Sequence, residues 1–405
     1  MDHVGIDLHK RDSQICIQTE AGEIIERRIR TDRERFAAEF GKRPQARILI
    51  EAMAESEWVA RCLESLGHEV VVADPNFAAM YATRSRRVKT DRRDAVTLAD
   101  ACRLGAYRQA HRTCERQRQV RAELVIRESI IRSRTKFIAL SGALVRREGL
   151  HIRSGNADHF LDRLREVAMD ESLRDRIQPL EHVLTLLQQE LKTADQRITS
   201  IVRGDPVIQL LCTVPGVGPI TATAFVATID TIERFAGAHQ LESYLGLVPS
   251  ERSSGERQRK GRITKAGNSR LRYLLLEAAW SILRSSKASS EELLTWAQQI
   301  AMRRGLKTAI VALARRLAGI LYAMWRVGKT FQPRHREGSI AEPARGKRAA
   351  SARFTSLGEG ERVRSCGCSR GRVADGRPFS LRRPHRAPAV RSALVERVET
   401  GEELR

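Results

Sequence analysis

The sequence predicts a mixed α/β region followed by mainly helical regions, and three observations lead to this fold class. Strand and helix signals alternate over the first hundred residues, apolar residues recur at heptad spacing within 112–203, and helical patterns continue from 206 to about 330. A chain of 405 residues, 41% of them hydrophobic, is long enough for two or three domains with sizeable cores. We expect domains at 1–110, 111–204 and 205–331, and a tail at 332–405.

Short apolar runs separated by turn signals predict the elements of the first region. The expected strands are 2–8, 13–19, 23–29, 46–52 and 68–74, and the expected helices lie near 32–41 and 55–66. Three successive strands followed by helix, strand, helix and strand are typical of a mixed sheet covered by helices.

A sustained hydrophobic seam predicts long helices in 111–204. Its members are Leu173, Ile177, Leu180, Leu184, Leu187, Leu191, Ala194, Ile198 and Ile201, and upstream Leu124, Ile131, Ile138 and Val145 recur every seven residues. Two interpretations stay open. The stripes are buried in an antiparallel hairpin within one chain, joined near 149–158, or they form an intermolecular coiled coil that holds protomers together.

The remaining chain is predicted to be helical and then disordered. Helical patterns after 206 are broken by a glycine turn at 214–219 and by a polar basic loop at 249–268. Residues 332–405 lose periodicity and hold 17 Arg and Lys against 9 Asp and Glu, which predicts a disordered basic tail that binds nucleic acid non-specifically.

Net charge indicates the class of partner. The 72 Lys and Arg against 49 Asp and Glu give +23, which favours a polyanionic partner. No run approaches the roughly 20 apolar residues of a membrane helix, and the first residues do not resemble a signal peptide. The seven cysteines are scattered without a CxxC pair, which fits a reducing cytoplasm and excludes a disulfide framework or a zinc ribbon.

Four carboxylates stand where phosphodiester chemistry would require them. Asp7 lies near the end of the first predicted strand, Glu51 ends another, and Asp91 and Asp94 share one face at the start of a helix. Four acidic oxygen donors can hold two hard divalent cations, Mg²⁺ or Mn²⁺, which clamp a scissile phosphate. Each acid alone is more often a turn or helix cap. What favours the site is the surrounding run of cations, which comprises Arg84, Arg86, Arg87, Lys89, Arg92 and Arg93.

The glycine turn and the loop after it carry two further candidates. Gly216 and Gly218 resemble a helix-hairpin-helix turn, in which backbone N–H groups approach a phosphate, although an ordinary Gly/Pro helix connection is also open. Ser254 precedes Gly255 in a loop rich in cations, which comprise Arg257, Arg259, Lys260, Arg262, Lys265, Arg270 and Arg272. A serine hydroxyl attacks phosphate if its proton is removed and cations bear the developing charge, but spacing alone is typical of a plain loop.

The combination resembles the insertion-sequence one-hundred-and-ten family of transposases, the DEDD transposases related to Piv-type DNA invertases. The resemblance rests on GIDLHK at 5–10, LIEA at 49–52, KTDRRDA at 89–95, VPGVGP at 214–219, and SSG with GRITKAGNSRLR within 253–272. Together these motifs cover residues 1 to about 330, and the tail after 332 has no counterpart.

The resemblance implies a RuvC-like N-terminal domain of ribonuclease-H fold, a helical spacer and a C-terminal transposase domain. It implies that Asp7, Glu51, Asp91 and Asp94 are the metal ligands and that Ser254, rather than the neighbouring Ser253, forms a phosphoserine link to DNA. It also implies a homo-oligomer, a dimer or tetramer, with catalytic sites composed from both domains. DNA ends and target, an element-encoded structured guide RNA, and a location beside the nucleoid in a prokaryotic cytoplasm are implied as well.

Three functional hypotheses follow. The first is a transposase that breaks and rejoins DNA through a covalent serine intermediate. The second is a metal-dependent nuclease or junction resolvase that uses water and does not need Ser254. The third is an inactive remnant that binds nucleic acid in a salt-sensitive way and is indifferent to loss of Asp7.

Overall fold

The computed structural model describes residues 1–82, 90–254, 257–285 and 290–332, with the side chains of 252–260 outside the description. The predicted basic tail, and the site candidates Arg84, Arg86, Arg87 and Lys89, lie outside the described residues.

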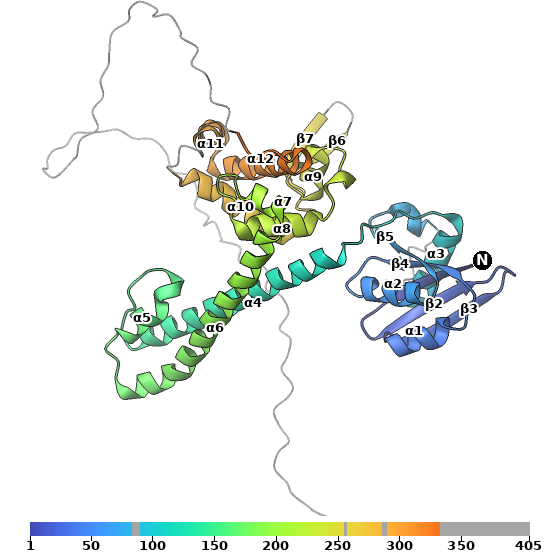
Figure 1. Ribbon diagram of the computed structural model, residues 1–405, viewed down its shortest axis with the longest axis horizontal. Coiled ribbons are helices and arrows are strands. Elements are labelled where there is room, and N and C mark those ends of the chain that lie inside the picture. Colours follow the sequence, from blue (N-terminus) through green and yellow to red (C-terminus); the bar gives the residue numbers. More distant parts are fainter. Residues whose placement is uncertain (83–89, 255–256, 286–289, 333–405) are drawn as a thin grey trace, which may run out of the picture. The chain divides into compact units, whose positions relative to one another are not determined.

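A five-stranded mixed sheet forms the N-terminal region (Figure 1). Its strands are β1 (Asp2–Leu8), β2 (Asp12–Gln18), β3 (Ile24–Arg30), β4 (Ala46–Glu51) and β5 (Glu69–Ala73), in the order β3-β2-β1-β4-β5. The first three strands pair antiparallel, while β4 pairs parallel with both β1 and β5. The predicted mixed α/β fold is confirmed, and each strand lies within two residues of its predicted bounds.

Helices cover both faces of this sheet. On one face α1 (Arg33–Phe40) and α2 (Ser56–Ser65) bury Phe36 and Leu63 against apolar residues of β1, β2, β4 and β5. On the other face lie the short turn η1 (Ala78–Tyr81) and α3 (Asp91–Leu104).

Gly5 of β1 sets how closely α3 approaches the sheet. A Cβ at this position would lie 2.2 Å from the Ala99 backbone nitrogen and 2.3 Å from the Ala95 carbonyl oxygen. Only a residue without a side chain allows this contact, since such distances are far inside van der Waals separation. The glycine therefore brings the first turn of α3 to the end of β1.

Two long helices form a hairpin within the chain. They are α4 (Glu115–Arg147) and α6 (Glu171–Arg203), and the connection holds η2 (Ala157–His159) and α5 (Phe160–Arg165). Ion pairs run in opposite register, from Glu123 with Arg197 at one end to Glu148 with Arg176 at the other, so the helices are antiparallel. Most of the predicted seam on α6 is buried, including Leu184. The hairpin interpretation is thus seen within one chain, and intermolecular pairing stays a prediction.

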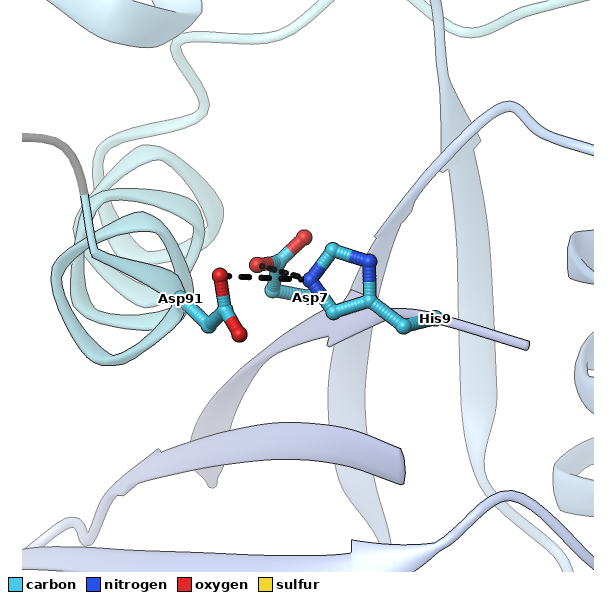
Figure 2. Close-up of side chains that lie close together, drawn as sticks. All are labelled: Asp7, His9 and Asp91. Carbon is cyan, nitrogen blue, oxygen red and sulfur yellow. Dashed lines mark ion pairs between the residues drawn. The ribbon is translucent and has the colours of Figure 1, made fainter. Parts of the chain in front are cut away.

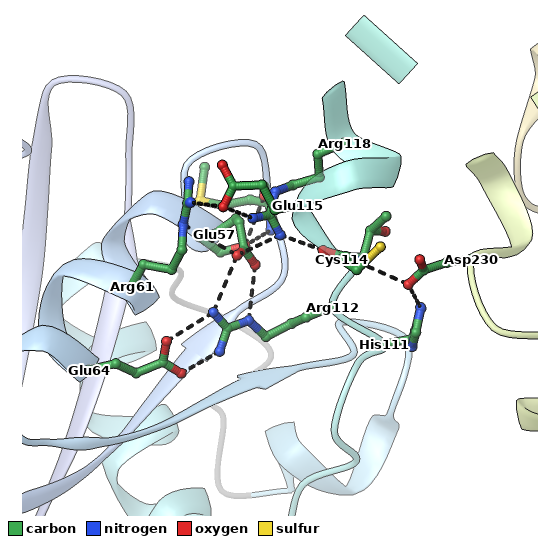
Figure 3. Close-up of polar contacts among 12 residues, drawn as sticks. Glu57, Arg61, Glu64, His111, Arg112, Cys114, Glu115, Arg118 and Asp230 are labelled. Atoms are coloured by element: carbon green, nitrogen blue, oxygen red, sulfur yellow. Dashed lines mark hydrogen bonds and ion pairs between the residues drawn. The ribbon is translucent and has the colours of Figure 1, made fainter. Parts of the chain in front are cut away.

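A charged network ties the connection between α3 and α4 to its neighbours (Figure 3). Arg112 donates hydrogen bonds to Glu57 and Glu64 of α2, 3.0 Å and 3.1 Å from Nε and Nη2 to the respective carboxylates. In the same connection, His111 Nε2 lies 2.8 Å from Asp230 Oδ2, which also accepts from the Cys114 backbone N–H at 3.1 Å.

The C-terminal region is a helical unit around one core. Its elements are α7 (Pro206–Leu211), α8 (Pro219–Ile229), η3 (Ile232–Arg234), α9 (Ala238–Tyr244), β6 (Pro249–Ser254), β7 (Arg257–Ile263), α10 (Ser269–Leu283), α11 (Glu291–Arg304) and α12 (Leu306–Val327). Phe225, Leu275 and Leu317 are fully buried in that core. The predicted mainly helical character is confirmed.

Two sequence expectations are corrected here. The segment predicted as a polar loop at 249–268 contains the antiparallel hairpin of β6 and β7, which the sequence hid because its strands carry few apolar residues to mark a buried face. The helix α12 is also long and apolar enough, by length and composition, to cross a membrane. It packs instead as a core helix, with Leu313, Leu317 and Leu321 fully buried.

Candidate metal centre and nucleic-acid interface

The ends of two parallel strands bring Asp7 and Glu51 to one edge of the sheet. The register pairs Gly5 with Leu49 and Ile6 with Ile50, so the next residues on β1 and β4 are Asp7 and Glu51. Alternation along a strand puts Asp7 on the face of Gly5 and Glu51 on the face of Leu49, which is the face that α3 covers.

The first turn of α3 supplies the other two acids. Thr90 caps the helix, with its side-chain oxygen accepting from the Arg93 backbone N–H at 3.3 Å, and Asp91 is the first helical residue. Asp94 follows one turn later on the same side. The predicted helix start at the DxxD pair is confirmed.

His9 lies between two of the carboxylates (Figure 2). Its Nε2 is 3.3 Å from Asp7 Oδ2 and 3.3 Å from Asp91 Oδ1. Ligand atoms of Asp7, His9 and Asp91 all lie within 4.8 Å of one another, which is close enough to share an ion. Sequence reasoning missed His9, although it stands two residues after Asp7 in GIDLHK and so can reach the same face.

The neighbouring acids at this edge of the sheet affect the pKa of Asp7. Burial of the Asp7 carboxylate raises its pKa, the His9 ring opposes this, and the charges of Asp94, Asp91 and Glu51 raise the pKa further, to about 6. The other three predicted acids therefore all act on Asp7. Oxygen donors gathered in this way suit a hard divalent cation.

A cavity of about 210 Å³ adjoins the acids. Its lining residues are His9, Asp12, Ser13, Gln14, Arg28, Asp91 and Arg92. Of the predicted cations on α3, Arg92 forms an ion pair with Glu26 of β3, and Arg93 is exposed.

The two glycines of the predicted phosphate turn differ. Gly216 has a φ of +78°, and a Cβ there would lie 2.6 Å from the Ala278 carbonyl oxygen, so packing against α10 requires this glycine. Gly218 is the N-cap of α8, and a Cβ there would meet nothing within 4 Å. Only Gly218 thus leaves open space at a helix N-terminus for a phosphate.

The serine candidate stands at the end of a strand. Ser254 is the last residue of β6 and pairs with Arg257 of β7, while Ser253 pairs with Gln258. The side chains of Ser254, Arg257, Arg259 and Lys260 lie outside the described part of the structure, so their distances to the acids are not defined.

The cations at the end of β7 and after it fall into two groups. Arg262 and Lys265 are exposed. Arg270 pairs with Glu128 of α4 at 2.9 Å, and its guanidinium stacks over Tyr273 at 5.4 Å from the ring centroid. Arg272 is buried and donates to the carbonyl oxygens of Leu245, Ala266 and Gly267, so this guanidinium holds the loop before α10.

A cluster of acids at one edge of a sheet, in a chain of net charge +23, fits the class of DNA-processing proteins, and comparison with known proteins is more specific. A family model of DEDD transposases of the IS110 type, described as Transposase, matches residues 4–146, and the model described as Transposase IS116/IS110/IS902 family matches 208–294. The chain belongs to the IS110 family of transposases.

Individual relatives agree with the family models. The chain is 28% identical over 337 residues to "Transposase for insertion sequence element IS1111A" of Coxiella burnetii, covering 81% of this chain and 91% of the relative. It is 29% identical to "Probable family 20 transposase" of Pseudomonas aeruginosa, covering 82% and 99%. It is 31% identical to "Putative transposase y4qE" of Sinorhizobium fredii, covering 66% and 72%.

Proposed function

We propose that this transposase excises and inserts a mobile element by metal-assisted DNA strand cleavage and rejoining through a phosphoserine intermediate. The observation that carries the proposal is the convergence of acids at the ends of β1 and β4 and at the start of α3. Burial of the Asp7 carboxylate, together with the charges of the other three acids, raises the pKa of Asp7 to about 6 against the opposing effect of His9. Acids crowded together in this way are typical of sites where a bound cation offsets their charge.

Asp7, Glu51, Asp91 and Asp94 are the proposed ligands of Mg²⁺ or Mn²⁺. The donor set fits these ions, because carboxylate oxygens are the ligands that hard cations prefer, and those of Asp7 and Asp91 already approach one another within 4.8 Å. When bound, the cation neutralises charge on the scissile phosphate and favours loss of the proton from the attacking hydroxyl. The acids would hold that cation in place against the phosphate.

Ser254 is the proposed nucleophile. Its Oγ forms a bond to phosphorus as the bond from phosphorus to a deoxyribose oxygen breaks, and the serine proton leaves to a base while the deoxyribose oxygen acquires one. Rejoining reverses these steps with a different DNA end. Arg257, Arg259, Lys260, Arg262, Lys265 and Arg270 are proposed to bear the phosphate charge, with Gly218 approaching the backbone.

The proposed organisation assigns residues 1–110 to a RuvC-like domain, 111–204 to a spacer and 205–331 to the domain that presents the serine. The strand order β3-β2-β1-β4-β5, with acids on β1, β4 and α3, supports the first assignment. The net charge of +23 fits both the DNA ends and a structured guide RNA encoded by the element. A homo-oligomer, a dimer or tetramer, would compose its sites from both domains.

Trapping a protein–DNA adduct tests the serine step. Full-length protein is incubated with radiolabelled DNA that carries an element end, and denaturing gels report label that travels with the protein. We expect an adduct with wild type and with the matched Ser253→Ala control, and none with Ser254→Ala. Cleavage without any adduct would instead identify a nuclease that uses water.

A further inference from the structure

One row of side chains crosses three strands beside the acids. Asp7 of β1 pairs with Gln14 of β2, and Gln14 pairs with Arg28 of β3. Directly paired residues in a sheet project to the same face. An acid, an amide and a guanidinium therefore follow one another across the sheet on the face that α3 covers.

Gln14 and Arg28 of this row reach the cavity beside the first turn of α3. Further along the face, Cys16 packs against Ala95 and Ala99 of α3. Gln14 lies two residues before Cys16 on the same face of β2, toward the start of α3 at Asp91. The cavity of about 210 Å³ lies there, and both Gln14 and Arg28 line it.

Two guanidinium groups from different elements border the cavity. Arg28 comes from β3 and lies 3.2 Å from Asp12, and its side chain is 70% exposed. Arg92 comes from α3, pairs with Glu26, and its side chain is 71% exposed. A guanidinium has five N–H donors, and contact with one carboxylate uses at most a few of them. Exposed pairs of this kind are also weak, so an anion can compete for them.

The spacing of the row fits the backbone of a nucleic acid. Adjacent strands lie about 4.8 Å apart, so Arg28 on β3 is about 10 Å from Asp7 on β1 at the backbone. One DNA strand carries a phosphate about every 3.4 Å of helix axis, so this stretch corresponds to two or three nucleotides.

We infer that Gln14, Arg28 and Arg92 form a subsite that holds the sugar-phosphate backbone of the cleaved strand within three nucleotides of the scissile phosphate. The inference rests on the proposed function, since it takes the acids as the place of cleavage. The subsite fixes the register of the strand and carries no base recognition, because phosphate contacts position without reading sequence.

The matched control is on the same strand. Arg27 is exposed like Arg28, but it pairs with Ile15 and so projects to the opposite face of the sheet. Arg27→Gln and Arg28→Gln remove the same charge one residue apart. Neither side chain is buried, so both variants are expected to fold, which circular dichroism verifies.

The test measures binding of the full chain to a DNA duplex carrying an element end, without cleavage. A set of duplexes replaces one phosphate at a time by a neutral methylphosphonate near the cleavage position. Wild type should lose about tenfold in affinity at one linkage within three nucleotides of that position, and Arg28→Gln should lose about as much on unmodified DNA. In Arg28→Gln the same neutral linkage should cause no further loss, whereas Arg27→Gln should behave like wild type.

Two outcomes would overturn the subsite. Either Arg28→Gln matches Arg27→Gln on every duplex, or the losses from Arg28→Gln and from the neutral linkage multiply, which means that the two groups do not touch. Failure of the proposed function is read separately, as unchanged strand cleavage by Asp7→Asn.

Discussion

Asp7 and Asp230 each have a histidine partner, and the surroundings of these two carboxylates are opposite. Asp7 contacts His9 at the acidic edge of the sheet, where Asp91, Asp94 and Glu51 add negative charge and its pKa rises to about 6. Asp230 contacts His111 at the connection before α4. Burial acts to raise the pKa of Asp230, but hydrogen bonds from Cys114 and His111 outweigh it and the pKa falls below its ordinary value.

The difference distinguishes a site from a structural contact. Around Asp230 and Arg112 the acids accept hydrogen bonds from neighbouring donors, as Figure 3 shows. The charge of these acids is therefore balanced within the folded chain. Around Asp7, burial and the neighbouring acids disfavour the charged carboxylate, and His9 only partly offsets this. We interpret the cluster around Asp230 and Arg112, the paired cluster, as a structural contact. We interpret the cluster around Asp7, the crowded cluster, as a binding site for a cation and a phosphate.

The largest expected effect separates activity from stability. Asp7→Asn should reduce strand cleavage by about a thousandfold or more, because a ligand of the cation is lost. It should raise the free energy of unfolding by about 1 kcal/mol at neutral pH, because it removes a charge that burial and the neighbouring acids disfavour. Cleavage assays and urea unfolding measure the two quantities.

Asp230→Asn is the matched change at the paired cluster. It should lower the free energy of unfolding by about 1–3 kcal/mol, because it weakens the hydrogen bonds from His111 and Cys114. If the two Asn variants shifted stability in the same direction, the contrast between the clusters would be wrong.

The next effect tests the approach of α3 to the sheet. Gly5→Ala should lower the free energy of unfolding by about 2–4 kcal/mol, since its Cβ meets the α3 backbone. Gly218→Ala should change it by less than about 0.5 kcal/mol, since its Cβ meets nothing. Thermal or urea unfolding decides the matter, and equal losses would contradict the packing described.

Arg112→Ala should have a smaller but clear cost. The change leaves Glu57 and Glu64 without one of their donors, and we expect a loss of about 1–2 kcal/mol of unfolding free energy. A loss that vanished in 1 M salt would assign the effect to screened charge alone, whereas we expect most of it to remain because the contacts are partly buried.

The smallest expected effect is on how the free energy of unfolding depends on pH, and Asp7 and Asp230 should contribute to it with opposite sign. The folded-state pKa of Asp7 is raised, so its contribution favours the folded state at low pH and is lost as pH rises from about 4 to about 6. The folded-state pKa of Asp230 is lowered, so its contribution is present above about pH 4 and is lost as pH falls below its folded pKa. Unfolding of wild type against each Asn variant, without divalent ions, should show these two slopes.

Much of the N-terminal region could be predicted because local signals and global packing agree there. Apolar runs marked the strands, and a DxxD pair after Thr90 marked the start of α3. The parallel pairing of β1 with β4, which the sequence did not predict, places Asp7 and Glu51 at the same end of the sheet. His9 was missed because nothing in the sequence tells which way a residue beyond a strand end will turn.

The C-terminal region could be predicted less well for physical reasons. The β6 and β7 strands are polar, so pairing through backbone hydrogen bonds left no hydrophobic signature. The sequence predicted Arg272 to be one more surface cation, yet it is buried and donates hydrogen bonds to loop carbonyl oxygens. Buried hydrogen bonds of this kind depend on tertiary contacts, which no local sequence pattern indicates.

Binding of Mn²⁺ to the full chain, followed by electron paramagnetic resonance near pH 7.5, tests the central claim most directly. Wild type should bind the ion, Asp7→Asn and Asp91→Asn should each weaken binding at least about tenfold, and Asp12→Asn should leave it unchanged, since Asp12 lines the same cavity but pairs with Arg28. Equal Mn²⁺ affinity of wild type and Asp7→Asn would contradict a metal site at the ends of β1 and β4.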